Sequence, residues 1–251
     1  MRAPDIAERL RAAGCVFAED EADLLVAAAR TPEELESMVE RRAAGEPLEH
    51  VIGWVDFAGV RIALEPGVFV PRARTEFLVA QAVALASPGA VVVDLCCGSG
   101  AVGAALGPVE LHAVDVDPVA VRCARRNLPA AAAVYEGDLF EPLPAALRGR
   151  VDVLVANVPY VPSGEIALMP AEARDHEPRL SLDGGPDGLD VARRVAAGAR
   201  EWLAPGGHLL IEASEQQAAR AAEDFARAGL EPRVELSEEL EVAVVIGRCS
   251  T

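Results

Sequence analysis

After Pro71 the chain alternates short apolar runs with longer stretches whose apolar residues recur at helical spacing. Buried parallel strands are apolar on both faces, and their connecting helices cover those faces, so the alternation predicts an α/β fold with a doubly wound, Rossmann-like sheet. Only a short connection separates the last two runs, which predicts an antiparallel final strand. The seven expected strands are Ala90–Asp94, Glu110–Val114, Ala132–Tyr135, Val151–Ala156, Gly207–Glu212, Pro232–Leu236 and Val242–Gly247. The expected helices are Thr75–Ala86, Ala101–Leu106, Pro118–Asn127, Leu189–Leu203 and Gln216–Ala228.

The first 70 residues follow two other patterns. Over positions 5–44 the apolar residues recur at helical spacing, and Thr31 followed by Pro32 is typical of the start of a helix. Beyond Gly45 the residues from Val51 to Leu64 alternate between apolar and other types, which predicts a β-hairpin. We therefore expect an N-terminal helical domain over 1–45, a hairpin linker over 46–70 and the α/β domain over 71–251.

The charge and cysteine content exclude several classes of protein. All 23 basic residues are arginine, and the 40 acidic residues give a formal net charge of −17. Proteins that bind nucleic acid present a basic surface to the phosphates, so this balance disfavours direct DNA or RNA binding. The five cysteines and four histidines lack metal-ligand spacing, which predicts a reduced, cytoplasmic protein without a metal site. The acidic N-terminus is unlike a signal peptide, and no apolar run reaches the roughly 18 residues that span a bilayer, so no membrane association is expected.

A glycine-rich turn follows the first strand of the expected sheet. Residues 91–103 read Val-Val-Val-Asp-Leu-Cys-Cys-Gly-Ser-Gly-Ala-Val-Gly. Gly98 and Gly100 allow a ligand to approach the backbone closely, and both a dinucleotide and S-adenosylmethionine fit this pattern. Asp94, at the end of the strand, would repel a diphosphate but attract the ammonium group of S-adenosylmethionine, which favours the methyl donor. Cys96 stands where the methionine part of that cofactor is expected to pass.

Acidic residues also end the next two strands. Asp115 is the candidate to accept hydrogen bonds from both ribose hydroxyls of the cofactor, with Val116 beside it. Asp138 is the candidate acceptor for the adenine amine, and Leu139 follows it in the cofactor site. Asp117 stands directly before a proline, and we expect it to cap the next helix rather than to bind a ligand.

The most specific signal is the segment Asn157-Val158-Pro159-Tyr160. It follows the fourth expected strand directly and so lies at the carboxyl edge of the sheet, where open α/β folds bind ligands. The segment resembles the Asn-Pro-Pro-Tyr signature of enzymes that methylate planar amino or amide nitrogens, with Val158 in place of the first proline. Adenine-specific DNA methyltransferases and protein-glutamine methyltransferases share that signature.

Further segments separate these two classes. Residues 69–76 read Phe-Val-Pro-Arg-Ala-Arg-Thr-Glu and resemble the Ile-Pro-Arg-Pro-x-Thr-Glu segment of the HemK/PrmC family of protein-glutamine methyltransferases. Glu177-Pro178 and residues 183–189, Asp-Gly-Gly-Pro-Asp-Gly-Leu, resemble a second segment of that family, and Glu212 also matches. The resemblance covers nearly the whole chain. It implies a seven-stranded class I methyltransferase fold, S-adenosylmethionine as cofactor, and a peptide chain release factor as partner, methylated on the glutamine of its Gly-Gly-Gln motif.

The same resemblance assigns roles to individual residues. In the family, the target amide donates its hydrogens to the asparagine side-chain oxygen and to the main-chain carbonyl of the next residue, which are Asn157 and Val158 here. Pro159 and Tyr160 complete this catalytic loop, and Asn157 also borders the cofactor. The residues expected to bind the substrate are Arg72, Glu76 and Glu177.

Three alternatives remain open at the level of sequence. The same loop could methylate an adenine or a small-molecule amine, although the net charge of −17 argues against DNA. A paralogue that binds the cofactor without catalysis is a second alternative, because Val158 replaces a proline of the signature. The literal Gly-x-Gly-x-x-Gly pattern leaves an NAD-dependent dehydrogenase as the third.

Overall fold

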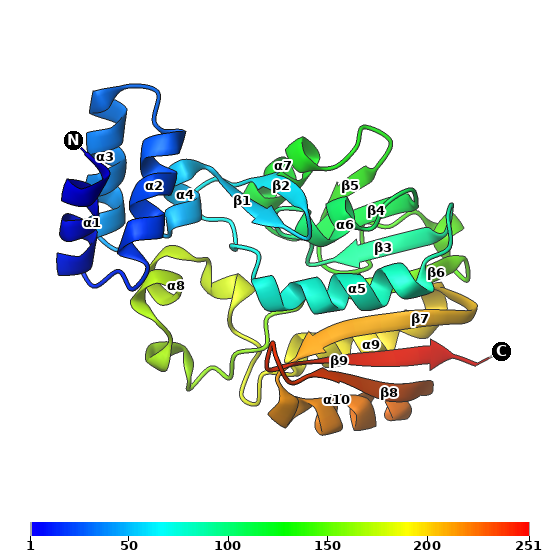
Figure 1. Cartoon of the computed structure of the whole chain (residues 1–251). Helices are drawn as coiled ribbons and strands as arrows, with labels where there is room; N and C mark the ends of the chain where they lie inside the picture. The colour runs from blue at the N-terminus through cyan, green and yellow to red at the C-terminus, as the bar shows by residue number, and fades with distance from the viewer. Residues whose placement is uncertain (1, 251) are drawn as a thin grey trace.

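The computed structural model describes residues 2–250, and a seven-stranded sheet is its centre (Figure 1). The strand order is β5-β4-β3-β6-β7-β9-β8, and β9 is antiparallel to both of its neighbours. The predicted doubly wound sheet and its antiparallel last strand are thus confirmed. The strands are β3 (Val91–Leu95), β4 (Glu110–Asp115), β5 (Ala133–Glu136), β6 (Val151–Ala156), β7 (Leu203–Ala213), β8 (Leu230–Ser237) and β9 (Val242–Cys249).

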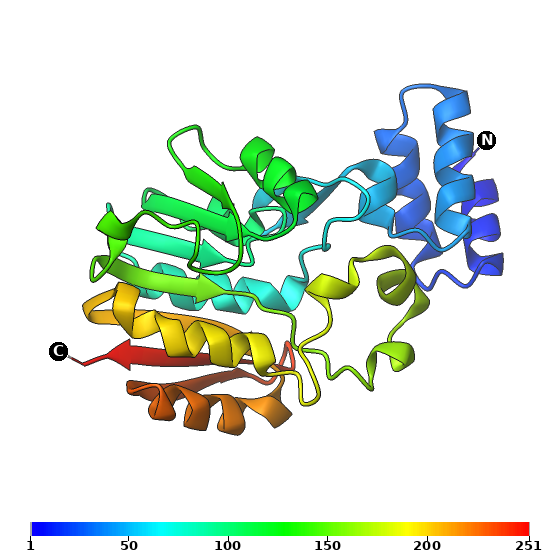
Figure 2. The ribbon, with the colours of Figure 1, turned by 180° about the vertical axis from the view of Figure 1, so that it is seen from behind.

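Helices cover both faces of the sheet. The helices α5 (Glu76–Leu85), α6 (Ala101–Ala105) and α7 (Pro118–Asn127) pack on one face. The helices α9 (Asp190–Trp202) and α10 (Glu215–Arg227) pack on the other face (Figure 2). Successive residues of β3 are buried on opposite faces of the sheet. Val92 belongs to the apolar cluster on the face of α5, and Val93 belongs to the cluster on the face of α9; both are fully buried. This two-sided burial explains why the strands read as continuous apolar runs.

Between β3 and β6, which are parallel, the direction in which the chain adds new strands to the sheet reverses. From β3 the strands β4 and β5 run outward on one side, whereas β6 begins the other side. In an open parallel sheet, the connections on the two sides of such a point diverge and leave a crevice at the carboxyl ends of the strands. The residues that follow β3, β4 and β6 meet at this crevice.

The N-terminal residues form the expected helical unit. Its helices are α1 (Ala3–Ala12), α2 (Ala18–Ala28) and α3 (Pro32–Ala43), and their buried side chains, among them Leu10 and Leu25, form a separate apolar cluster. Thr31 caps α3 as predicted, because its side-chain oxygen accepts a hydrogen bond from the Glu34 backbone N–H at 3.1 Å. In Figure 1 this unit lies beyond the carboxyl ends of the parallel strands.

The hairpin begins later than the alternation from Val51 predicts. A short helix, α4 (Leu48–Ile52), comes first and ends at Gly53, whose φ of +85° is a left-handed conformation that favours glycine. Val51 is buried with the helical unit rather than on a strand. The hairpin itself consists of β1 (Trp54–Phe57) and β2 (Val60–Ala63), and its Phe57 is buried in the apolar cluster that also contains Leu78 of α5. The hairpin therefore packs on the α/β core rather than spanning a gap.

A long segment between β6 and α9 contains elements that the periodicity did not indicate. They are the short helix α8 (Ala171–His176) and two 3₁₀ helices, η3 (Ile166–Leu168) and η4 (Arg179–Ser181). Two further 3₁₀ helices, η1 (Ala73–Thr75) and η2 (Ala145–Leu147), lie elsewhere in the chain. The segment lies between the sheet and the helical unit in both views (Figures 1 and 2). Across residues 2–250, no helix combines the length and apolar character that crossing a membrane requires.

Candidate active site at the carboxyl edge of the sheet

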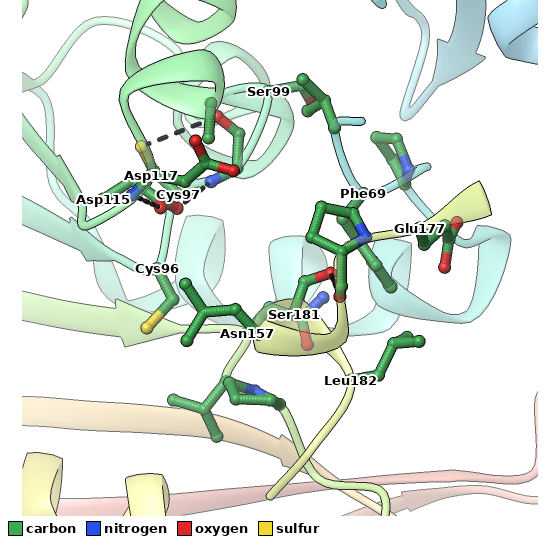
Figure 3. A pocket seen from close by; sticks show the side chains of 18 of the residues that line it. Phe69, Cys96, Cys97, Ser99, Asp115, Asp117, Asn157, Glu177, Ser181 and Leu182 are labelled. Atoms are coloured by element: carbon green, nitrogen blue, oxygen red, sulfur yellow. Dashed lines mark hydrogen bonds between the residues drawn. The ribbon is translucent and has the colours of Figure 1, made fainter. Parts of the chain in front are cut away.

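A cavity of about 670 Å³ opens at the carboxyl edge of the sheet, between the glycine-rich turn and the segment that carries α8 (Figure 3). Figure 3 shows Cys96 and Asp115 on one side, Glu177 on the other and Asn157 between them. Most of the residues predicted for the site line this cavity. They are Arg72, Asp94, Cys96, Gly98, Asp115, Val116, Asp138, Leu139, Asn157, Val158, Pro159, Tyr160 and Glu177.

Asp115 organises the glycine-rich turn. Its two carboxylate oxygens accept hydrogen bonds from the backbone N–H groups of Gly98 at 2.8 Å and of Asp117 at 2.9 Å. Each oxygen keeps a further lone pair, so the carboxylate is still able to accept two hydroxyl groups from a ligand. Burial raises the pKa of Asp115. Asp117 caps α7 as predicted, accepting from the Val119 N–H at 2.8 Å.

Asp94 is a buried acid with little to balance its charge. Its side chain accepts a hydrogen bond from the Gly103 N–H at 3.0 Å, and the residue is only 1% exposed. Burial raises its pKa to about 7, and the nearby Asp115 carboxylate contributes in the same direction. A cation in the cavity would stabilise both carboxylates, whereas a diphosphate would be repelled. The two carboxyl groups on this side of the cavity therefore fit S-adenosylmethionine, which is cationic, better than a dinucleotide.

The turn between these acids is conformationally unusual. Cys96 has a φ of +56°, a left-handed conformation that is uncommon outside glycine. Its side chain is half-buried and lines the cavity, and desolvation together with the neighbouring carboxylates raises its pKa, so the group stays a neutral thiol rather than a nucleophile. Among residues 2–250, no group of three or more His, Cys, Asp or Glu side chains is arranged to hold a metal ion.

Two predicted residues lie outside the cavity lining. Gly100 begins α6 with a φ of +79°, and a Cβ atom there would lie 3.0 Å from Leu128 Cγ, so this glycine permits α6 to pack closely on α7. Glu76 accepts a hydrogen bond from the Ala58 N–H at 3.0 Å and so links α5 to the turn of the hairpin. The structure gives both residues a packing role at these positions.

Asp138 lines the cavity but already has a charged partner. Arg194 of α9 donates to its carboxylate at 2.5 Å, and both side chains are about half exposed. Phe140, which the sequence left as either an adenine neighbour or a core residue, belongs to the core. Its ring stacks on Trp202 with centroids 5.8 Å apart and lies outside the cavity lining.

The catalytic loop predicted from Asn157 to Tyr160 crosses the centre of the site. The Asn157 side-chain Nδ2 donates to the Thr75 hydroxyl at 3.4 Å, and Val158 is 2% exposed within the core. The Tyr160 hydroxyl donates to Glu212 Oε1 at 3.2 Å. Burial and this carboxylate raise the pKa of Tyr160, so its hydroxyl remains protonated. The loop is therefore tied to two elements that are distant in sequence.

Glu212 is a buried acid at the end of β7, behind the loop. Its side chain is 1% exposed, and the Arg74 guanidinium lies 3.6 Å from Oε1. Burial raises its pKa, while Thr75, Arg74 and Tyr160 act in the opposite direction. Oε2 has no partner within 3.5 Å among the described residues. The sequence matched Glu212 to the family without assigning it a role, although a single acid at the end of an apolar strand is the same signal that singled out Asp94.

A second anchor of the loop is Gln217 of α10, which the sequence analysis missed. Its side-chain Nε2 donates to the carbonyl oxygens of Tyr160 at 2.9 Å and of Asp187 at 3.0 Å. Gly188 makes this approach possible, because a Cβ there would lie 2.2 Å from the Tyr160 carbonyl oxygen. Gly184 is similarly tight against the Pro159 carbonyl, at 2.7 Å. The glycines of residues 184–188 thus pack directly on the backbone of the predicted catalytic loop.

Two of the predicted substrate-binding residues form an ion pair. Arg72 donates to Glu177 at 2.6 Å, and Glu177 also accepts from the Val70 N–H at 3.2 Å. The Glu177 side chain is fully buried, and burial raises its pKa although Arg72 lowers it. The pair joins the chain before α5 to the segment after α8, so both sides of the cavity mouth are connected.

Comparison with known proteins places this architecture among methyltransferases. Residues 74–162 match the family model described as ribosomal protein L11 methyltransferase (PrmA). A methyltransferase structure from Pyrococcus furiosus has a TM-score of 0.57 at 16% identity, covering 77% of this chain and 90% of that one. An E. cuniculi complex responsible for methylation of the eRF1 translation termination factor has a TM-score of 0.53 at 18% identity, covering 74% and 99%. At these identities the likeness shows the fold.

Sequence identity to curated relatives is higher. The release factor glutamine methyltransferase of Geobacter sulfurreducens is 39% identical over 208 residues, which are 79% of this chain and 72% of that protein. The corresponding protein of Mycolicibacterium smegmatis is 39% identical over 201 residues, or 77% of this chain and 71% of that protein. The chain therefore belongs to the family of release factor glutamine methyltransferases.

Proposed function

We propose that this chain transfers a methyl group from S-adenosylmethionine to the side-chain amide nitrogen of a protein glutamine, the glutamine of the Gly-Gly-Gln motif in a peptide chain release factor. Membership of the family supports the reaction class and the substrate. The observation that carries the proposal is the position of Asn157, whose side chain borders the same cavity as Asp94 and Asp115.

The acidic side of the cavity suits the cofactor. Asp94 would face the ammonium group, Asp115 the ribose hydroxyls, and the backbone at Gly98 would allow the ligand to approach closely. Asp138 would accept from the adenine amine, for which its ion pair with Arg194 leaves a second carboxylate oxygen. Bound there, S-adenosylmethionine supplies an electrophilic methyl group at the centre of the site.

The loop at the end of β6 suits the acceptor. An amide nitrogen is a poor nucleophile because its lone pair is delocalised into the carbonyl group. The Asn157 side-chain oxygen and the Val158 carbonyl would accept its two hydrogens, and this holds the nitrogen where its lone pair faces the incoming methyl group. The substrate nitrogen would form its new bond to the methyl carbon while the carbon–sulfur bond of the sulfonium breaks and leaves neutral S-adenosylhomocysteine. The nitrogen would then lose one proton to solvent, so the loop needs no strong base. Tyr160 forms a wall of the cavity beside this position.

The test is a methyl-transfer assay with the purified full chain. Methyl-labelled S-adenosylmethionine is incubated with the release factors of the same organism, and peptide mass spectrometry locates the label. We expect one methyl group on the Gly-Gly-Gln glutamine and none when this residue is changed to glutamate in the release factor. Parallel reactions with DNA, RNA and small amines test the other acceptors, and a label only on one of those would overturn the proposal.

Asn157→Ala separates the two halves of the site. We expect this variant to lose methyl transfer by at least about 100-fold, because the target amide loses an acceptor made for the transition state. Its affinity for S-adenosylmethionine, measured by calorimetry, should stay within about twofold of the unsubstituted protein. An equal loss of binding and turnover would contradict the assignment of Asn157 to the substrate.

A further inference from the structure

Asp138 differs from the neighbouring acid of the cavity in how its side chain is held. Both oxygens of Asp115 accept hydrogen bonds from backbone N–H groups. The Asp138 carboxylate is 40% exposed, and Arg194 is the one donor to it among the described residues. An exposed carboxylate turns readily about its side-chain bonds, so without a partner it would be directed to water for much of the time. Its direction in the cavity therefore depends on Arg194.

The position of Arg194 follows from the face of α9 on which it lies. Val191 and Arg194 are three residues apart, so they share a face of the helix, and both line the cavity. The adjacent Arg193 is directed elsewhere, because it pairs with Asp224 of α10. Arg194 Nη2 donates to Asp138 Oδ2 at 2.5 Å, which leaves Oδ1 to accept from a ligand in the cavity.

A carboxylate with a fixed direction distinguishes between purines. The amine at C6 of adenine donates hydrogen bonds, whereas the oxygen at C6 of hypoxanthine accepts them. A carboxylate only accepts, so an oxygen of Asp138 held toward this position stabilises adenine and repels hypoxanthine. A carboxylate that can turn to water loses both effects, because it neither meets the amine nor stays in the way of the oxygen.

We propose that Arg194 is a positioning residue that directs the Asp138 carboxylate at the base of the cofactor and so makes the site selective for adenine. The inference rests on the proposed function, which assigns the adenine amine to Asp138. Arg194 acts through this carboxylate, so its effect is on recognition of the cofactor and not on the methyl group that reacts.

The test measures base selectivity without turnover. Calorimetry with the full chain compares S-adenosylhomocysteine with S-inosylhomocysteine, which carries the C6 oxygen in place of the amine. We expect the unsubstituted protein to prefer the adenine compound at least about tenfold, because its amine bonds to a charged acceptor. Arg194→Met should reduce this preference to about threefold or less. Arg194→Lys should retain most of it, because the observed pair uses a single nitrogen.

Two further variants control the measurement. Arg150→Met removes an exposed cation whose partner is the Ala146 carbonyl, and it should leave the preference unchanged. Asp138→Asn replaces a group that only accepts by one that can also donate to the C6 oxygen, so it should lower the preference at least as much as Arg194→Met. An unchanged preference in Asp138→Asn would mean that Asp138 does not meet the base, which would overturn the inference.

The ratio of the two affinities separates positioning from other roles of an arginine. An arginine that only stabilises the fold, or that contacts both bases alike, would change both affinities by the same factor. An unchanged preference in Arg194→Met would therefore overturn the positioning role and leave the proposed function intact. Failure of the unsubstituted chain to bind either compound would overturn both proposals, because the cavity would then hold no adenosyl group.

Discussion

At the scale of single residues, Asp94 is a buried carboxyl group whose ionised form is disfavoured by its surroundings. The carboxyl group has one backbone donor, lies beside another acid, and has its pKa raised by burial from 3.8 to about 7. Between these values the folded protein binds more protons at this position than the unfolded chain does. The contribution of Asp94 to stability therefore falls as the pH rises from about 4 to 7 and stays constant above that. A bound cation would offset the loss of stability that ionisation of Asp94 causes.

The raised pKa of Asp94 predicts a pH-dependent affinity for S-adenosylmethionine. If the ionised carboxylate binds the ammonium group, its population rises from about one tenth at pH 6 to one half at pH 7, and affinity should rise about fivefold. An α-amino group stays charged over this range, because its pKa is about 7.7 or higher. Titration calorimetry at several pH values measures the slope.

Two variants control this measurement. Asp94→Asn should weaken binding and flatten the profile, apart from what Asp115 contributes. Asp56→Asn changes an exposed acid on the hairpin that pairs with Arg61, and it should leave the profile unchanged. An affinity independent of pH in the unsubstituted protein would show that Asp94 does not meet the cofactor as a carboxylate.

At the scale of elements, the predicted catalytic loop is held from outside its own strand. β6 delivers Asn157 to the carboxyl edge, but the backbone of Tyr160 is tied to α10 by Gln217. The same amide binds the Asp187 carbonyl and so fixes residues 184–188 against the loop. Gln217 also belongs to the capping box of α10, with Ser214. One side chain thus connects the start of a helix to two loops of the site.

Removing this link should cost both stability and turnover. We expect Gln217→Ala to lower the free energy of unfolding by about 1–3 kcal/mol, because two carbonyl oxygens lose their donor. Methyl transfer should fall because the loop is no longer held in place. The neighbouring Gln216 is exposed, so Gln216→Ala is the matched control and should change neither quantity. Urea titration and the methyl-transfer assay measure both; equal behaviour of the two variants would mean that the link is dispensable.

At the scale of the whole molecule, the helical unit is attached to the segment over the cavity by Arg42. This side chain of α3 is 8% exposed and donates to Glu21 of α2 at 2.6 Å and to Glu172 of α8 at 3.1 Å. Burial lowers its pKa, but the two carboxylates outweigh burial and leave the pKa above its usual value. Glu172 is 41% exposed and also lines the cavity, so an ion pair between a buried arginine and a part-exposed glutamate connects the N-terminal helices to the candidate site.

Breaking this attachment should destabilise the protein strongly. Arg42→Met leaves the buried Glu21 without its cation, and we expect a loss of about 3–5 kcal/mol in the free energy of unfolding. Arg30 pairs with Glu34 on the surface and is 85% exposed, so Arg30→Met should change the free energy of unfolding far less than Arg42→Met.

Two measurements check the effect of Arg42→Met. Chemical denaturation gives the loss of stability, and limited proteolysis should show faster cleavage within residues 165–185 of Arg42→Met than of Arg30→Met. Similar denaturation midpoints and equal cleavage of the two variants would argue against Arg42 as the residue that stabilises and attaches the helical unit.

Local patterns predicted much of the sheet and of the candidate site. Strand boundaries follow from apolar runs, since buried strands exclude polar groups, and the ends of those strands carry Asp94, Asp115 and Asn157. Because parallel strands end at one edge, their terminal residues were expected to meet, and they line one cavity. The alternation places the start of the hairpin at Val51, which is within the short helix α4, because five residues are too few to establish a helical period.

By itself, the sequence determined the succession along the chain of the seven strands and the main helices of the α/β domain, the candidate acids and the loop that begins at Asn157. Only the tertiary structure decided which groups support them: Thr75 contacts Asn157, whereas Glu212 and Gln217 contact Tyr160. It also gave Gly100 and Glu76 packing positions outside the cavity. The reason is physical. Periodicity reports which side of an element is buried, whereas a hydrogen bond between residues 50 or more positions apart depends on how the elements are packed together.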